Sequence, residues 1–333
     1  MSEGTARPTT MTREDATFRR LVQLAVSQRE ETSRAKVNLA RRHLIQRAAF
    51  GLLWLSGIAA VAILLAVVGY VVVQGAKVVN LEFLTTPPAG GLATSDVGGM
   101  STTIVSTVYL VFWTIVFAGP LGILAAIYLV EYAEEMEGGS GLVPIIVSVV
   151  RFAVEILAGV PSIIFGLFGY ALFVSAVALG WSFSLRSAAV TGACLVLPVI
   201  IRASEEAIKA VPRSYREASL ALGATKWQTA WKIVLPAAAP GIITGIVLSV
   251  GRVVSETAVF FVTFGGTVRA PDTVFDLSSP GRSMALHVYY LAMETRAFDK
   301  AMGTGAVLIL TIILINLLIN IVSRRLTAKL KGR

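Results

Sequence analysis

The chain has 333 residues, of which 55% are hydrophobic and 15% charged, and its mean hydropathy is +0.75. Soluble domains contain roughly 25% charged residues, so this composition excludes an ordinary soluble domain. The net charge of +9 would suit a nucleic-acid-binding protein, but the basic residues lie at the ends of apolar segments. We therefore predict an all-α integral membrane protein with no nucleic-acid partner. One cysteine, Cys194, and two distant histidines offer no disulfide framework and no metal site.

The apolar segments predict six transmembrane helices, because a bilayer core about 30 Å thick requires about 20 apolar residues in a helix. The expected spans are 48–74, 102–130, 159–180, 186–204, 239–263 and 303–323. The apolar run 142–180 is too long for one upright helix, and Arg151 and Pro161 interrupt it. We therefore interpret 142–157 as a helix that lies at the interface or packs against the bundle. Pro198 predicts a kink in the fourth span.

The distribution of Lys and Arg predicts the orientation of these spans. With a cytoplasmic N-terminus, the inside segments contain 22 basic residues and the outside segments contain five. Cytoplasmic loops carry such an excess, so we expect both termini inside. Residues 1–47 would then be a basic cytoplasmic extension and 326–333 a basic cytoplasmic tail. Residues 14–47 would form a helix along the membrane surface or a partly disordered tail, and the sequence leaves both open.

A polar but regular segment at 209–236 separates the fourth and fifth spans. Pro212 is a suitable start for a helix and Gly223 a suitable stop. A second short helix is expected to begin around Thr225 and to end before Pro236. Its apolar face would be formed by Trp227, Trp231 and Ile233. Two short amphipathic helices joined at a glycine are typical of a docking element, and the alternative is a hairpin lying among lipid headgroups.

The spacing within this segment resembles the EAA loop of ABC importer permeases. Glu217-Ala218 is followed by Gly223 and then, after nine residues, by 233–236, Ile-Val-Leu-Pro. Ser219 stands where that family usually has alanine. The resemblance implies that the loop inserts into a groove of a separate ATPase subunit. The residues it assigns to this coupling are Glu217, Ala218, Leu220, Gly223, Trp227 and Trp231.

The sequence contains no G-x-x-x-x-G-K-S/T phosphate-binding loop, so the chain is not expected to hydrolyse ATP. It also lacks HExxH and GxSxG, and it offers no nucleophile–base pair for an intramembrane enzyme. We therefore predict a protein that is not an enzyme and has no cofactor of its own. ATP and magnesium would be bound by the partner ATPase.

Ionisable residues at membrane depth cost about 2.5–3.5 kcal/mol each on insertion scales, so each is a candidate functional residue. The candidates for a substrate pathway are Arg202, Glu205, Arg252 and Glu256. Arg202 and Glu205 are three residues apart and Arg252 and Glu256 four apart, so each pair is expected to share a helix face. Arginine suits an oxyanion because its planar fork binds two oxygens. The alternative interpretation is that these residues form internal ion pairs that lock the bundle.

Larger segments are similar to the PstA-type permease subunit of phosphate ABC transporters. These segments are 126–133, 155–170, 197–227, 241–258 and 307–325, and the likeness extends over 48–325. It implies the MetI-like fold of type I ABC importer permeases, with residues 75–325 as the permease domain and 209–236 as its coupling loop. It also implies that Arg202, Glu205 and Arg252 lie in the phosphate path. Ser255 and Val259 depart from the glycine and proline common there.

The resemblance further implies the partners of an importer in the bacterial inner membrane. These are a second, homologous permease subunit, a dimer of ATP-binding subunits, and an extracytoplasmic phosphate-binding protein docking on 75–101 and 264–302. Sulfate, molybdate and phosphonate importers share the EAA loop, so another oxyanion is an alternative substrate. A second alternative is a stand-alone proton-coupled transporter that uses Glu155, Glu205 and Glu256 as a relay.

Overall fold

The computed structural model describes residues 45–88, 98–133 and 142–330, and the chain divides into two units, 1–69 and 70–333. Most of the expected N-terminal extension, up to residue 44, and the last three residues of the expected tail lie outside the described residues. The helix Ile45–Gly75, 31 residues long, is apolar enough to cross a bilayer and contains the predicted first span.

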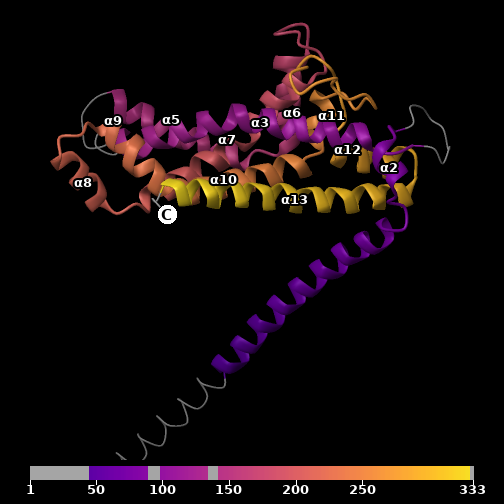
Figure 1. The fold of residues 1–333 in the computed structure, drawn as a ribbon, viewed down its shortest axis with the longest axis horizontal. Helices are drawn as coiled ribbons and strands as arrows, with labels where there is room; N and C mark the ends of the chain where they lie inside the picture. Colours follow the sequence, from indigo (N-terminus) through magenta and orange to yellow (C-terminus); the bar gives the residue numbers. More distant parts are fainter. Residues whose placement is uncertain (1–44, 89–97, 134–141, 331–333) are drawn as a thin grey trace, which may run out of the picture. The chain divides into compact units, whose positions relative to one another are not determined.

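The second unit is a bundle of helices with short π-helical segments, labelled η (Figure 1). Its elements are α2 (Leu81–Thr85), α3 (Ser101–Ile127), η1 (Tyr128–Tyr132), α5 (Leu142–Gly159), α6 (Ser162–Gly169), η2 (Tyr170–Val174), α7 (Leu185–Lys209), α8 (Arg213–Ala221), α9 (Lys226–Thr229), η3 (Ala230–Val234), α10 (Leu235–Ser255), α11 (Ala258–Thr263), α12 (Met284–Tyr289), η4 (Tyr290–Glu294) and α13 (Phe298–Leu330). Five described helices of the chain are long and apolar enough to cross a membrane, or six if one bent pair counts as a span. The prediction of an all-helical membrane protein is confirmed.

The bent pair lies where a single third span was expected at 159–180. The helices Val147–Gly159 and Ser162–Val174 meet at 107°, and the second ends at Val174. Pro161, in an extended conformation, precedes α6 and has no N–H to continue the hydrogen bonding of α5. The expected boundaries of this span are therefore wrong. Helix α5 packs against α7, in agreement with the second interpretation offered for 142–157.

The fifth span also differs from the expectation, at both ends. The helix runs without interruption from Lys226 to Ser255, so the second loop helix does not end before Pro236. Pro236 is the second residue of α10, which begins directly after η3. The π turn shifts the backbone hydrogen-bond pattern just before the proline, whose missing N–H is then tolerated. At the other end α10 stops at Ser255, and α11 begins separately at Ala258.

Helix α7 is the centre of the bundle and packs mainly against α3 and α10. Small residues permit these close approaches. A Cβ at Gly122 would lie 2.7 Å from the Ile200 side chain, and one at Gly245 would lie 2.5 Å from Ala203 Cβ. Interfaces between membrane helices are enriched in such small residues because dispersion contacts between close backbones drive their association.

The two ends of the bundle are different in kind (Figure 1). Helices α8 and α9 lie at one end, together with the C-terminal end of α13. At the other end the segment 264–283 is hydrogen-bonded to the start of α7: Leu185 N–H donates to Ser279 O at 2.9 Å, and Arg186 N–H donates to Leu277 O at 2.9 Å. The predicted coupling loop and this second loop therefore lie at opposite ends of α7.

Candidate functional site

The helices α8 and α9 form a hairpin, residues 213–229, that we call the coupling hairpin. Gly223 has φ +83, a left-handed conformation that favours glycine and ends the turn after α8. Thr225 caps α9 with a capping box: its Oγ1 accepts from Gln228 N–H at 3.2 Å, and its own N–H donates to Gln228 Oε1 at 3.0 Å. The expected helix start, stop and second start are confirmed.

The six residues predicted for ATPase coupling all lie on the surface of this hairpin or of the adjoining η3. Glu217, Ala218 and Gly223 are exposed. Leu220, Trp227 and Trp231 are 43%, 53% and 47% exposed. The indole rings of the two tryptophans stack with centroids 5.4 Å apart. A groove of about 310 Å³, lined by Leu124, Ile127, Tyr128, Tyr132 and Trp227, extends this apolar surface onto the end of α3. The hairpin therefore presents a preformed apolar surface.

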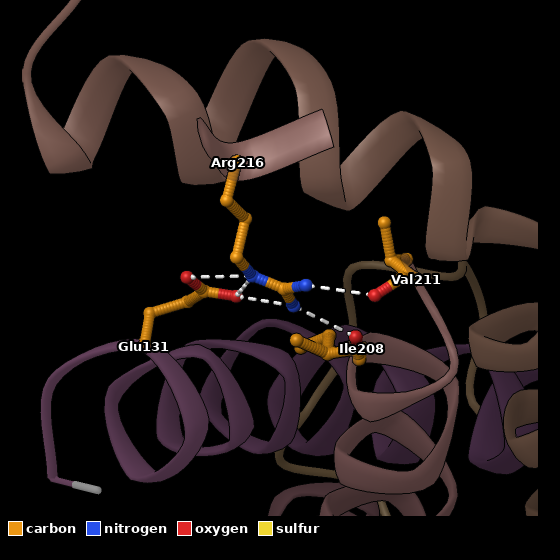
Figure 2. A network of polar contacts seen from close by, with 4 residues as sticks. All are labelled: Glu131, Ile208, Val211 and Arg216. Carbon is orange, nitrogen blue, oxygen red and sulfur yellow. Dashed lines mark hydrogen bonds and ion pairs between the residues drawn. The ribbon is translucent and has the colours of Figure 1, made fainter. Parts of the chain in front are cut away.

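A network of polar contacts fixes the hairpin to the bundle, and Figure 2 shows its four residues. Arg216 on α8 pairs with Glu131 on η1, with Nη2 to Oε1 at 2.8 Å and Nε to Oε1 at 2.9 Å. Its Nη1 donates to Val211 O at 2.8 Å and its Nη2 to Ile208 O at 2.9 Å. Both charged side chains are largely buried, at 19% and 12% exposed. This arrangement is a bidentate ion pair combined with one hydrogen bond to the last turn of α7 and one to the segment that follows it.

A second polar contact closes the hairpin itself. Ser219 Oγ and Thr229 Oγ1 are 2.9 Å apart and join α8 to the end of α9. An alanine at position 219, the usual residue of the EAA pattern, has no hydroxyl for this contact. The departure noted in the sequence thus has a structural role in this chain.

The predicted pathway arginines lie on the two packed helices α7 and α10, and both are exposed within this single chain. In the described part of the chain, neither Arg202 nor Arg252 makes an ion pair or a side-chain hydrogen bond. Arg202 and Glu205, which were expected to share one face of α7, therefore form no ion pair in the described structure. Internal ion pairs do not account for the two arginines in the described structure.

The packing of α10 on α7 shows how the two arginines are placed along the bundle. Gly241 approaches Ala207, and Gly245 approaches Ala203. This antiparallel register places Ile246 level with Arg202 and Val196 level with Arg252. The two arginines are therefore offset by six residues, about 9 Å along the helix axes. They occupy different depths of the bundle.

The helix that was expected to carry both Arg252 and Glu256 ends at Ser255, one residue before Glu256. Glu256 has φ −76 and ψ 130, an extended conformation. Its Oε1 accepts a hydrogen bond from Ala258 N–H at 3.2 Å. The carboxylate thus satisfies one of the free N–H groups at the start of α11. A run of residues compatible with helix hid this break from the sequence analysis.

At the opposite end of the bundle a buried histidine contacts Arg282. His287 on α12 is 3% exposed, and its Nδ1 lies 3.4 Å from Arg282 Nη1, so the ring accepts from the guanidinium as neutral imidazole. The guanidinium also lies 4.0 Å from the centre of the Tyr290 ring and donates to Gly266 O. Burial, and then the positive charge of Arg282, lower the pKa of His287 from 6.5 to about 3.

This shift predicts a loss of stability in acid. Between pH 6.5 and about 3, the unfolded chain binds a proton at His287 that the folded chain does not. The free energy of unfolding should therefore fall as the pH falls through this window, by up to about 1.4 kcal/mol per pH unit. Thermal unfolding of the detergent-purified protein between pH 7 and 5 measures the slope. The His287→Gln variant should show a shallower slope, and an equal slope would contradict the prediction.

Glu131, Arg216 and Thr229 were not identified as functional residues from the sequence. A weak signal existed for Glu131, the first of four glutamates that follow an apolar span. Its partner, however, lies 85 residues further along the chain. Such a pair follows from the packing of α3 against α7, which the sequence of one chain does not specify.

Comparison with known proteins shows the family to which this chain is related. Residues 118–332 match the family described as "Binding-protein-dependent transport system inner membrane component". The chain is 33% identical over 284 residues to the phosphate transport system permease protein PstA of Yersinia pestis, covering 85% of this chain and 86% of that protein. It is 29% identical over 289 residues to the probable ABC transporter permease protein YqgI of Bacillus subtilis, covering 83% and 94%.

A solved structure supports the fold alone. An inward-facing structure of the MetNI methionine ABC transporter matches with a TM-score of 0.50 and 21% identity, covering 69% of this chain and 97% of that chain. The predicted MetI-like fold is confirmed. The family works with separate ATPase subunits and a binding protein, and its permeases carry no catalytic activity. The chain therefore belongs to the family of binding-protein-dependent transport system inner membrane components, and it is a multi-pass permease subunit of an ABC importer and not an enzyme.

Proposed function

We propose that this chain is a permease subunit of an ATP-driven importer of inorganic phosphate, and that it forms half of the transmembrane pathway. The main support for an oxyanion substrate is the pair of arginines, Arg202 and Arg252, which have no acidic partner in the described structure. A membrane protein keeps such costly charges where they act on a ligand or a partner. Guanidinium groups bind oxyanions through paired hydrogen bonds.

The relatives support phosphate among the oxyanions. The Yersinia pestis protein that is 33% identical over most of both chains is named a phosphate transport permease. A phosphate ion that meets the two arginines at different depths is passed along the bundle and is not held in one cage. Glu205, three residues from Arg202, is available to accept the proton of a partly protonated phosphate.

The remaining parts of the importer follow from the coupling hairpin. Its exposed apolar residues, Leu220, Trp227 and Trp231, dock into a separate ATP-binding subunit, which binds ATP and magnesium. Two such subunits lie below this chain and a second, homologous permease subunit. The hairpin and both termini face the cytoplasm, as the excess of basic residues favours. The opposite end, with the segment 264–302, faces an extracytoplasmic phosphate-binding protein.

Transport by the whole complex tests the substrate. The chain is expressed with its second permease, ATPase and binding-protein partners, and the complex is reconstituted in proteoliposomes with internal ATP. We expect labelled phosphate to accumulate, unlabelled phosphate to compete, and sulfate, molybdate and methylphosphonate to leave uptake unchanged. ATP-dependent uptake of sulfate or molybdate in place of phosphate would exclude the proposed substrate while leaving the ABC importer assignment intact.

A further inference from the structure

We propose that Arg216 is a positioning residue that links the coupling hairpin to two membrane helices at once, so that movement of the hairpin is transmitted to α3 and α7 together. The inference rests on the proposed function, because it concerns how the ATPase drives this permease. Arg216 is not proposed to contact substrate or ATP. It acts through Glu131 on η1 and through the backbone at the end of α7 (Figure 2).

Helix α8 has little other attachment to the bundle. Within α8, all nine residues of which are described, no side chain is buried. Ser219 contacts Thr229, which lies in the first turn of the continuous helix 226–255 and not on α3 or α7. The next buried residues after α8 are Thr229 on α9 and Ala230 and Val234 on η3. Hydrophobic packing therefore secures η3, whereas α8 is held by polar contacts, of which those of Arg216 are the ones that reach η1 and α7.

The Arg216 guanidinium binds a carboxylate on one side and two backbone carbonyls on the other. Nε and Nη2 bind the Glu131 carboxylate, while Nη1 and Nη2 donate to Val211 O and Ile208 O. Ile208 O lies in the last turn of α7, where the carbonyls carry partial negative charge that a cation stabilises. Arginine presents five donors in a rigid plane, and lysine presents a single ammonium on a flexible stem. Lysine at position 216 keeps the charge but cannot bind three acceptors in this geometry.

Two of the groups that Arg216 binds belong to different membrane helices. Glu131 follows α3 directly, because η1 continues that helix. Ile208 is on α7, three residues after Glu205 and six after Arg202. A displacement of α8 by the ATPase thus pulls on the helix that carries the proposed phosphate ligands. Without the link, α8 still docks through its exposed apolar surface but moves with less effect on α7.

If Arg216 has this role, substituting it should uncouple ATP hydrolysis from transport and leave the assembly of the complex intact. In proteoliposomes containing the whole complex, Arg216→Lys should lower the phosphate transported per ATP hydrolysed by about fivefold or more, the lower end of coupling between linked sites. The amount of ATPase subunit that copurifies should stay at the wild-type level, since the docking residues are intact. Arg213→Lys is the matched control: it makes the same substitution on the same helix, at an exposed position, and should leave the ratio unchanged.

A double-mutant cycle separates this role from two independent effects. If Arg216 and Glu131 act as one link, Glu131→Gln should lower the ratio, and Arg216→Lys combined with Glu131→Gln should be no worse than Arg216→Lys alone. An unchanged ratio in Arg216→Lys would overturn the inference. So would loss of ATPase copurification in that variant, because the residue would then serve assembly only. If the wild-type complex transports another oxyanion, the ratio is measured with that ion, so failure of the proposed substrate is distinguishable from failure of the link.

Discussion

Replacing Trp227 and Trp231 together by alanine is expected to abolish association with the ATPase subunits. Each indole is about half exposed in this chain, and the two rings stack on one another. Aromatic side chains that fill a partner's pocket are frequent hot spots, and truncation of one costs about 2 kcal/mol or more. Loss of both should therefore weaken the complex by about 30-fold or more, even if the two effects do not add fully.

Copurification of the ATPase with the tagged permease measures this effect, and phosphate uptake should fall in parallel. The matched control is Phe275→Ala, an exposed aromatic residue in the segment 264–283 at the opposite end of α7. It should leave ATPase association intact. Thermal stability of the isolated permease should be similar in wild type and double variant, since neither indole is buried. Wild-type amounts of bound ATPase in the double variant would contradict the assignment of this surface as the ATPase docking site.

Local signals in the sequence predicted the coupling hairpin well. Pro212, Gly223 and Thr225 act through their own backbone geometry or through neighbours three residues away, so their effects on helix starts and stops can be deduced without a fold. The length and hydropathy of the spans can also be deduced without a fold, because the thickness and apolar interior of the bilayer determine both. The fold class, the first short helix, the start of the second and the exposed apolar face are therefore confirmed, whereas the end expected for the second helix before Pro236 is wrong.

Features that depend on backbone irregularity or on distant packing were missed. The break at Glu256 arises because its carboxylate caps α11, which competes with continuing α10 through a sequence compatible with either. The passage of the helix through Pro236 depends on the π turn η3, which no sequence pattern indicated. The link between Glu131 and Arg216 depends on how α3 meets α7. Each of these is decided by tertiary context, which propensities do not contain.

Replacing either Arg202 or Arg252 by alanine is expected to abolish phosphate uptake while the protein still assembles in the membrane. Neither guanidinium makes an ion pair or side-chain hydrogen bond in the described chain, so its removal breaks no contact that holds the fold. Its loss leaves the phosphate without a charge-assisted bidentate partner in a low-dielectric pathway. Truncation of one member of a desolvated charge pair costs about 2–5 kcal/mol, equivalent to about 30-fold or more in uptake.

The offset of the two arginines along the bundle also predicts how the double variant should behave. Because they lie about 9 Å apart along the helix axes, they contact the ion at successive positions, and loss of either interrupts the same path. The double variant should then be no more defective than each single variant. Arg202→Lys and Arg252→Lys, which keep the charge without the fork, should retain partial uptake, and Arg269→Ala outside the spans is the control. Membrane insertion and ATPase copurification should match the wild type in all of them. Normal uptake in both alanine variants would remove the arginines from the pathway and return them to a structural role between the permease subunits.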